Sequence, residues 1–238
     1  MSGSRASTLA TLGALILWLQ PPYCGAQSPQ ETPPPSKDYL RRLEAALLVQ
    51  TLNADLLSHD SASVTLERWC SAHQLASPAR ITAARVRNAE QPATEIQRQR
   101  LRVTPTDEVR YRKVSLRCGT VVLSEADNWY VPARLTPQMN QLLEGSDTPF
   151  GLAVQSLHFQ RRTISAEMLW QPLPPGWEMS RPAASDDTGE LCVPGQLLRH
   201  RALLTLPDGT PFSEVVETYT SNVLAVPRLA SLHPCTKG

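Results

Sequence analysis

The chain has 238 residues, of which 41% are hydrophobic, and this size suits one globular domain with a single sizeable core. Its formal net charge is only +1, so the composition gives no reason to expect binding to nucleic acid or to a charged membrane surface. Arginines are concentrated between residues 80 and 117. Surface solvation accounts for most of them, and an anion-binding patch would need only two or three.

Residues 1–26 are predicted to be an export signal and not part of the fold. Arg5 precedes an apolar run, Leu9–Leu19, which is too short to span a membrane as a helix. The small residues of Cys24-Gly25-Ala26, followed by Gln27, are typical of a cleavage site. We therefore expect the mature protein to be periplasmic or secreted, with no membrane contact after removal of the signal.

The rest of the chain is predicted to be one domain behind a linker. Residues 27–37 contain three consecutive prolines and form an extended linker, and residues 38–238 form the domain. Within the domain, residues 171–194 are rich in proline and polar residues and are predicted to be a long loop insertion. The domain is expected to be a monomer.

Removal of the signal would leave four cysteines: Cys70, Cys118, Cys192 and Cys235. An even number in an exported chain predicts disulfides, with three possible connectivities. The pair Cys192–Cys235 is favoured because both residues lie in poorly patterned segments, where a cross-link stabilises most. There is no CxxC motif and the histidines lack metal-ligand spacing, so neither a metal nor a cofactor is predicted.

Helical patterns occupy the first part of the domain. Asp38 begins an amphipathic helix whose apolar stripe recurs at helical spacing through Leu40, Leu43, Leu47, Leu48, Leu52 and Leu56. A second helix is predicted over Ser63–Gln74. The pattern between residues 81 and 103 is ambiguous: a strand could begin at Ile81, and another could hold Leu101 and Val103.

Strand patterns dominate the remainder. The predicted elements are a hairpin turning at Cys118-Gly119-Thr120, a short helix between Thr136 and Gly145, a strand from Arg162 to Trp170, and a hairpin of Leu197–Leu206 with Phe212–Tyr219. Because helices come first and both hairpins are antiparallel, the fold class is predicted to be α+β, with one largely antiparallel sheet of about six strands flanked by helices.

Arg112 is the first candidate for a functional residue. On its strand it shares a face with Val114, Leu116 and Cys118, so its side chain ends a core-facing row. A buried arginine is costly without an anionic partner. That partner could be a carboxylate of the protein or the carboxylate of a ligand, held by a bidentate contact.

Four further polar residues lie at the start of, or within, rows of apolar residues that share one face of a predicted strand. Glu214 and Glu217 lie on opposite faces of the last strand, so one of them is expected to face the core as a proton donor or in an ion pair with Arg112 or Arg162. Arg162 and His200 could line the same cavity, although His200 could equally be a structural histidine. No GxSxG motif and no glycine-rich phosphate loop is present.

Taken in order, several short motifs between residues 100 and 220 resemble the chorismate pyruvate-lyase family and its wider superfamily of ligand-binding domains. The motifs are Tyr111-Arg112-Lys113-Val114-Ser115-Leu116, Val131-Pro132, Leu135-Thr136, Thr148-Pro149-Phe150-Gly151, Arg162, Asp208-Gly209-Thr210-Pro211 and Glu217-Thr218-Tyr219.

The resemblance implies a six-stranded antiparallel sheet around an enclosed site for an aromatic acid. By correspondence, Arg112 would hold the ring carboxylate, Phe150 and Gly151 would contribute contacts beside it, and Glu217 or Glu214 would assist proton transfer. Two functions are therefore compatible with the sequence. One is binding of a small aromatic carboxylate with elimination of pyruvate from chorismate, and the other is a non-catalytic secreted domain that binds or senses a small molecule.

Overall fold

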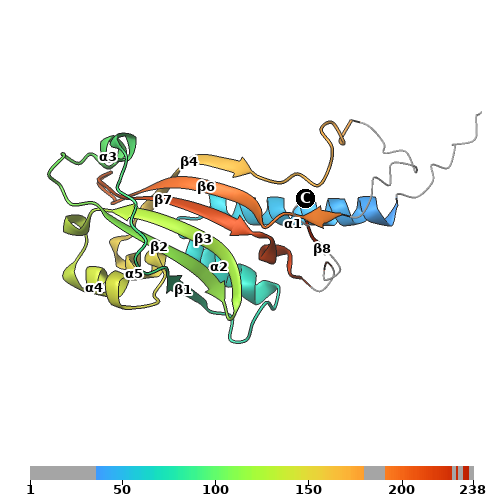
Figure 1. Cartoon of the computed structure of the whole chain (residues 1–238), viewed down its shortest axis with the longest axis horizontal. Helices are drawn as coiled ribbons and strands as arrows, with labels where there is room; N and C mark the ends of the chain where they lie inside the picture. The colour runs from blue at the N-terminus through green and yellow to red at the C-terminus, as the bar shows by residue number, and fades with distance from the viewer. Residues whose placement is uncertain (1–35, 180–190, 227–228, 230–232, 236–238) are drawn as a thin grey trace, which may run out of the picture. The chain divides into compact units, whose positions relative to one another are not determined.

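Alternating apolar and polar residues build a six-stranded antiparallel sheet in the computed structural model, which describes residues 36–179, 191–226, 229 and 233–235 (Figure 1). The strand order is β1-β2-β3-β7-β6-β4. The strands are β1 (Ile81–Arg85), β2 (Arg110–Cys118), β3 (Val121–Tyr130), β4 (Gln160–Met168), β6 (Gln196–Thr205) and β7 (Pro211–Thr220). Two short strands, β5 (Cys192–Val193) and β8 (His233–Pro234), pair in parallel. The predicted α+β class with one antiparallel sheet is confirmed.

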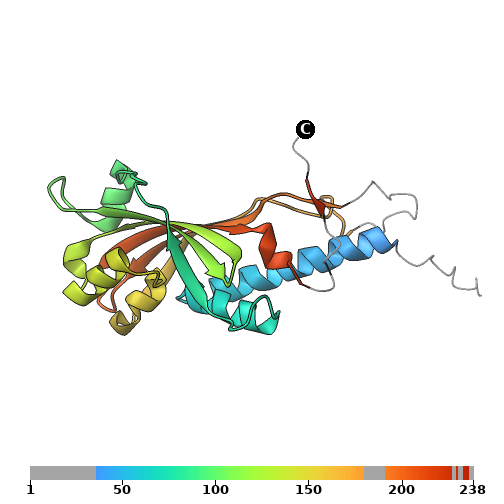
Figure 2. The ribbon, with the colours of Figure 1, turned by 60° about the horizontal axis from the view of Figure 1, so that its bottom comes forward.

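Helices cover both faces of this sheet. The α-helices are α1 (Lys37–Leu57), α2 (Ala62–Ala72), α3 (Glu95–Leu101), α4 (Pro137–Gly145) and α5 (Phe150–Ala153). The short 3₁₀ helices are η1 (Pro132–Arg134), η2 (Gln155–Leu157) and η3 (Ser221–Leu224). Figure 2 shows α3 on one face of the sheet and the other α-helices on the opposite face. All described residues belong to one compact unit, Pro34–Gly238. The predicted export signal lies outside the described residues, as does most of the linker.

Three buried clusters hold the helices to the sheet. The largest joins α1 and α2 to the strands through residues such as Leu52, Leu66, Leu116 and Tyr219. A second, aromatic cluster gathers Tyr130, Phe150, Phe159 and Phe212 beside α4 and α5. A third lies under α3 and contains Leu101, Trp129 and Leu203. Because both sheet faces are covered, several strands carry apolar rows on each side.

One sequence prediction about local structure is wrong, and one ambiguity is resolved. The leucine stripe predicted for α1 does not face the core in the first half of the helix, where Leu40 is 45% exposed and Leu47 is 68% exposed. The buried positions of this helix are Ala45, Val49, Leu52 and Leu56. The ambiguity between residues 81 and 103 is resolved as a strand at Ile81 and a helix, and not a second strand, at Leu101, because a capping box at Thr94 begins α3 and Leu101 ends it.

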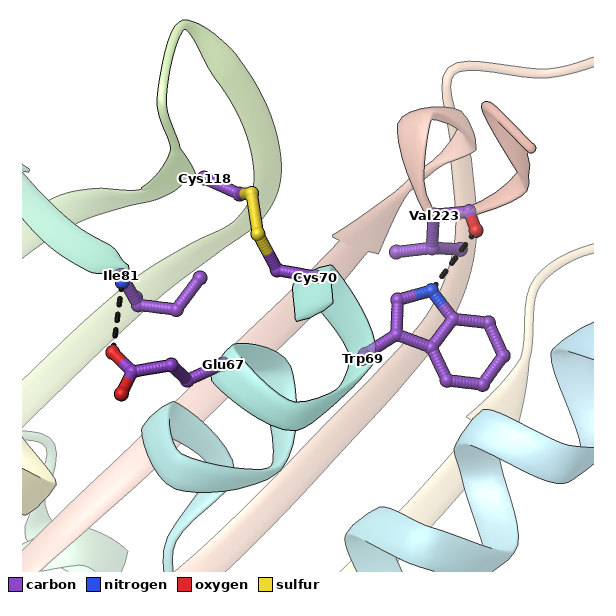
Figure 3. The surroundings of a disulfide bond; sticks show 6 residues. All are labelled: Glu67, Trp69, Cys70, Ile81, Cys118 and Val223. Atoms are coloured by element: carbon purple, nitrogen blue, oxygen red, sulfur yellow. Dashed lines mark hydrogen bonds between the residues drawn. A yellow bond between two sulfur atoms is a disulfide. The ribbon is translucent and has the colours of Figure 1, made fainter. Parts of the chain in front are cut away.

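The four described cysteines form two disulfides. Cys70 at the end of α2 is bonded to Cys118 at the end of β2 (Figure 3), and Cys192 in β5 is bonded to Cys235 just after β8. The pairing favoured from the sequence is therefore confirmed. The first disulfide is flanked by two hydrogen bonds that also hold α2: Ile81 N donates to Glu67 at 3.0 Å, and Trp69 Nε1 donates to the Val223 carbonyl at 3.1 Å (Figure 3).

Candidate functional site

The guanidinium of Arg112 lies inside the fold, with its residue only 2% exposed. Its position on β2 puts it on the same face as Val114 and Leu116, as the alternation predicts. Nε donates to the Leu143 carbonyl at 3.0 Å and Nη2 donates to the Thr148 carbonyl at 3.0 Å. The backbone of α4 and of the segment before α5 therefore fixes the orientation of the guanidinium.

Arg112 forms no ion pair among the described residues. Its Nη1 is also buried without a hydrogen-bond partner in that part of the chain. The pKa of Arg112 is lowered to about 10, chiefly by burial and then by the positive charge of Arg85, while Tyr130 and Asp147 act in the opposite direction. The arrangement is a fixed, desolvated cation with one nitrogen, Nη1, that has no described acceptor, which favours an anionic ligand.

A small cavity is lined by Val114 and Leu116, which follow Arg112 on the same face of β2, while Arg112 itself is not among its lining residues. It measures about 20 Å³, which is room for roughly one water molecule. The polar and charged residues that line it are Asp60, Ser61, Ser63, Asn128, Arg161 and Glu217. Phe150 and Gly151 line it too.

The ring of Phe150 occupies the aromatic side of this site. It lies stacked at 6.4 Å from the ring of Phe212 and edge-on at 5.6 Å from the ring of Tyr130. A Cβ atom at Gly151 would lie 2.5 Å from Ser61 Oγ, so a larger residue would require the Ser61 side chain to move. The small size of the cavity follows from this close packing.

Glu217 lines the cavity as part of a buried ion pair. Its carboxylate accepts a hydrogen bond from Arg161 Nη2 at 2.6 Å, and the two side chains are 7% and 4% exposed. The hydroxyl of Tyr219 donates to the same oxygen at 3.2 Å. Glu217 is thus engaged by two neighbours of its own chain. This geometry does not present it to a substrate as a proton donor.

Arg161, and not Arg162, faces the cavity, which corrects the sequence prediction. The prediction extended the alternation of Ala166 and Met168 backwards along β4. An irregularity between Thr163 and Ser165 shifts the register by one residue, so the inward position before it falls on 161. Arg162 is exposed.

The ambiguity between Glu214 and Glu217 is also resolved. Glu214 is fully buried on the opposite face of β7, where it pairs with Arg201 at 2.6 Å and with Arg100 of α3 at 3.3 Å. It therefore joins α3 to the sheet and lies outside the cavity. The prediction of Glu214 as a ligand-binding residue is not supported by this placement.

His200 has a structural role in the described chain and does not line this cavity. It is fully buried, and its Nε2 lies 2.8 Å from Asn53 Oδ1 of α1, while Nδ1 has no partner among the described residues. Its pKa is lowered to about 4, chiefly by burial and then by the charge of Arg161, while Glu217 opposes both. The imidazole is therefore neutral at pH 7 and ties α1 to β6.

Sequence reasoning did not identify Arg161 or the polar residues from α2 and β3. Asn128 could have been found, because it shares the parity of Ala126 and Tyr130 in β3, and it lies opposite Arg112 in the β2–β3 register. Ser61 and Ser63 carried no such signal, since their approach depends on how α2 packs on the sheet.

A second pocket, of about 440 Å³, lies between α1, the end of α2 and the residues after η3. Its described lining is mostly apolar and includes Leu47, Leu48, Val226 and Leu229, with Glu44 and His73 at its polar side. Among the described residues that line it there is no lysine or arginine. Within the described residues there is no group of histidine, cysteine, aspartate or glutamate side chains that could hold a metal ion. None of the helices in this part of the chain is long and apolar enough to span a membrane.

The sheet and the enclosed cation define the class as an α+β domain with a small interior site. The chain belongs to the same family as the uncharacterized protein y4mC of Sinorhizobium fredii (strain NBRC 101917 / NGR234). The two are 52% identical over 189 residues, which is 79% of this chain and 80% of that protein. No family model matches the chain.

Solved structures resemble the chain only distantly. PhnF from Mycobacterium smegmatis has a TM-score of 0.45 at 13% identity, over 70% of this chain and 66% of that one. The possible transcriptional regulator YydK from Bacillus subtilis has a TM-score of 0.36 at 11% identity, over 66% of this chain and 62% of that one. The matched parts span less than two thirds of either protein. Likeness at this level carries no argument about function.

Proposed function

We propose that this domain binds a small carboxylate whose acid group pairs with Arg112. One observation carries the proposal: Arg112 is 2% exposed and its guanidinium is held by two backbone carbonyls, yet no described carboxylate forms an ion pair with it and Nη1 has no described partner. A carboxylate at Nη1 would supply the missing charge through a charge-assisted hydrogen bond.

The site as it stands limits what can enter. A cavity of about 20 Å³ holds roughly one water molecule, so a ring enters only when Phe150 and α5 move aside. Tyr130 and Phe212 already contact the ring of Phe150. An incoming aromatic ring could take over these contacts, which supports a small aromatic carboxylate as the ligand.

Binding without turnover is the function that the geometry favours. The glutamate expected to supply a proton, Glu217, is engaged by Arg161 and Tyr219. We therefore propose a non-catalytic, divergent member of the chorismate-lyase-like superfamily. Pyruvate elimination from chorismate is the competing outcome of the test below.

We also propose that the domain works in the periplasm or outside the cell. Two features support this: the export-signal pattern of residues 1–26, and the pairing of all four remaining cysteines in two disulfides. Disulfides of this kind persist in oxidising compartments.

Thermal unfolding of the protein expressed from its full chain tests the binding proposal. Benzoate and 4-hydroxybenzoate serve as probes, and benzamide serves as a neutral analogue of benzoate. At a ligand concentration 100 times Kd, binding stabilises by about 2.7 kcal/mol, which raises Tm by roughly 5–10 °C for a domain of this size. Benzamide should give no such shift.

Arg112→Met should abolish the shift, while Arg110→Met should keep it. Arg110 lies on the same strand face but is partly exposed and pairs with Glu108 and Glu144, so it is a matched control. An unchanged benzoate shift in Arg112→Met would refute the proposed site. Incubation with chorismate should release no pyruvate, and Arg112-dependent release would establish a lyase instead.

A further inference from the structure

Strand β4 forms one edge of the six-stranded sheet (Figure 1). It pairs with β6 on one side, and no described strand pairs with it on the other. An edge strand of this length presents unpaired backbone N–H and C=O groups and is a template for pairing with another chain.

The hydrogen bonds at the two ends of this segment show which backbone groups point outward. Leu169 N donates to the Leu197 carbonyl, towards β6, at 2.9 Å. Arg161 N instead donates to the side chain of Asp60 at 2.8 Å, away from β6. Backbone groups alternate in direction along a strand, and the irregularity between Thr163 and Ser165 shifts the alternation by one residue. Thr163 and Ala166 are therefore the outward-facing positions in the middle of the edge.

Thr163 and Ala166 of one copy can pair with Ala166 and Thr163 of a second copy. A twofold axis between Ile164 and Ser165 places Thr163 opposite Ala166 of a second copy, so that outward-facing groups meet as a hydrogen-bonded antiparallel pair. The same axis places Arg162 opposite Glu167 of the second copy. That pair occupies a non-hydrogen-bonded position, where opposing side chains lie closest.

Arg162 and Glu167 also project from the same face of the sheet. Arg162 lies opposite Leu203 in the register and Glu167 lies opposite Arg199. Leu203 and Arg199 share a face because they are separated by an even number of residues along β6. This face is the one covered by α3, since Leu203 belongs to the cluster under that helix. Both Arg162 and Glu167 are exposed, so they are available for contact across the axis.

We propose that two copies of this chain associate through antiparallel pairing of β4 with β4, held by reciprocal Arg162–Glu167 ion pairs. The sheet then continues from one copy into the other. The charge pattern favours a second copy because Arg162 and Glu167 of one edge each meet the opposite charge on the edge of the other copy. Asp60 caps the Arg161 N–H and confines the ladder to the middle of the edge. This assembly differs from the monomer expected from the sequence.

Charge reversal tests the pairing. Sedimentation equilibrium of the protein expressed from its full chain should show a monomer–dimer equilibrium. Arg162→Glu and Glu167→Arg should each raise the dimer dissociation constant at least about tenfold, because each places like charges opposite one another twice. The double variant Arg162→Glu/Glu167→Arg should return it to within about threefold of the wild type.

Arg117→Glu is the matched control. Arg117 is an exposed arginine of β2, at the other end of the sheet, and its reversal should leave the dissociation constant unchanged. A wild-type chain that remains monomeric at all accessible concentrations would overturn the proposal. So would a dimer that ignores both single reversals, or one that both reversals weaken and the double variant does not restore.

Discussion

Protonation of His200 should make the domain lose stability in mild acid. The imidazole is fully buried between α1 and β6, with Arg161 and Glu217 nearby and the ring of Tyr219 packed edge-on against it at 5.5 Å. Its Nε2 contacts Asn53, and its Nδ1 has no partner in the described chain. A proton on Nδ1 would therefore create a buried, unpaired donor beside a positive charge.

The size of the effect follows from the pKa difference between the two states. The pKa of His200 is lowered from 6.5 to about 4 in the folded domain, chiefly by burial and then by Arg161. Between these two values the unfolded chain binds more protons than the folded one, so stability falls as pH decreases through the window. At about 1.4 kcal/mol per pKa unit, the loss amounts to about 3 kcal/mol when pH 4 is reached.

Urea unfolding at a series of pH values from 7 to 4 measures this loss. Other groups also titrate in this range, so the prediction concerns the difference between wild type and His200→Gln, whose profile should be flatter by about 3 kcal/mol. His158→Asn is the control, because His158 is exposed and has a positive φ of 48°, which asparagine tolerates. Parallel profiles for wild type and His200→Gln would refute the reasoning.

Two further predictions concern buried pairs. The Cys70→Ala/Cys118→Ala variant removes a cross-link between residues 48 positions apart and should lose about 4 kcal/mol of unfolding free energy, measured in urea. A loss below about 1 kcal/mol would show that this disulfide contributes little. Glu217→Gln should cost about 3–5 kcal/mol, because it leaves the Arg161 guanidinium buried without a counter-charge. Glu125→Gln, at an exposed position of β3, should leave Tm unchanged.

Much of the fold could be predicted from the sequence because its signals are local. Both hairpins, with turns at Gly119 and Gly209, follow from alternation and turn chemistry, and the cap at Thr136 marks the start of α4. The buried face of the first half of α1 could not be predicted, because leucines occupy more than one face of this helix. Only tertiary packing selects which of these faces is buried.

The site could be predicted only in part, because helices cover both faces of the sheet and both faces of a strand can therefore be buried. Alternation correctly placed Arg112 inside the fold. It could not separate Glu214 from Glu217, since α3 buries one face of β7 and the cavity lies on the other. Arg161 was missed because the irregularity in β4 has no sequence signal as strong as a turn.

The central claim is that Arg112 holds a carboxylate, and a crystal structure with 4-bromobenzoate tests it most directly. The anomalous signal of bromine locates the ring independently of any search model. The account predicts a carboxylate oxygen about 2.7–2.9 Å from Arg112 Nη1, with the ring of Phe150 displaced. A ligand in the apolar pocket beside Leu47 and Leu48, or an empty site beside Arg112 at saturating ligand, would contradict it.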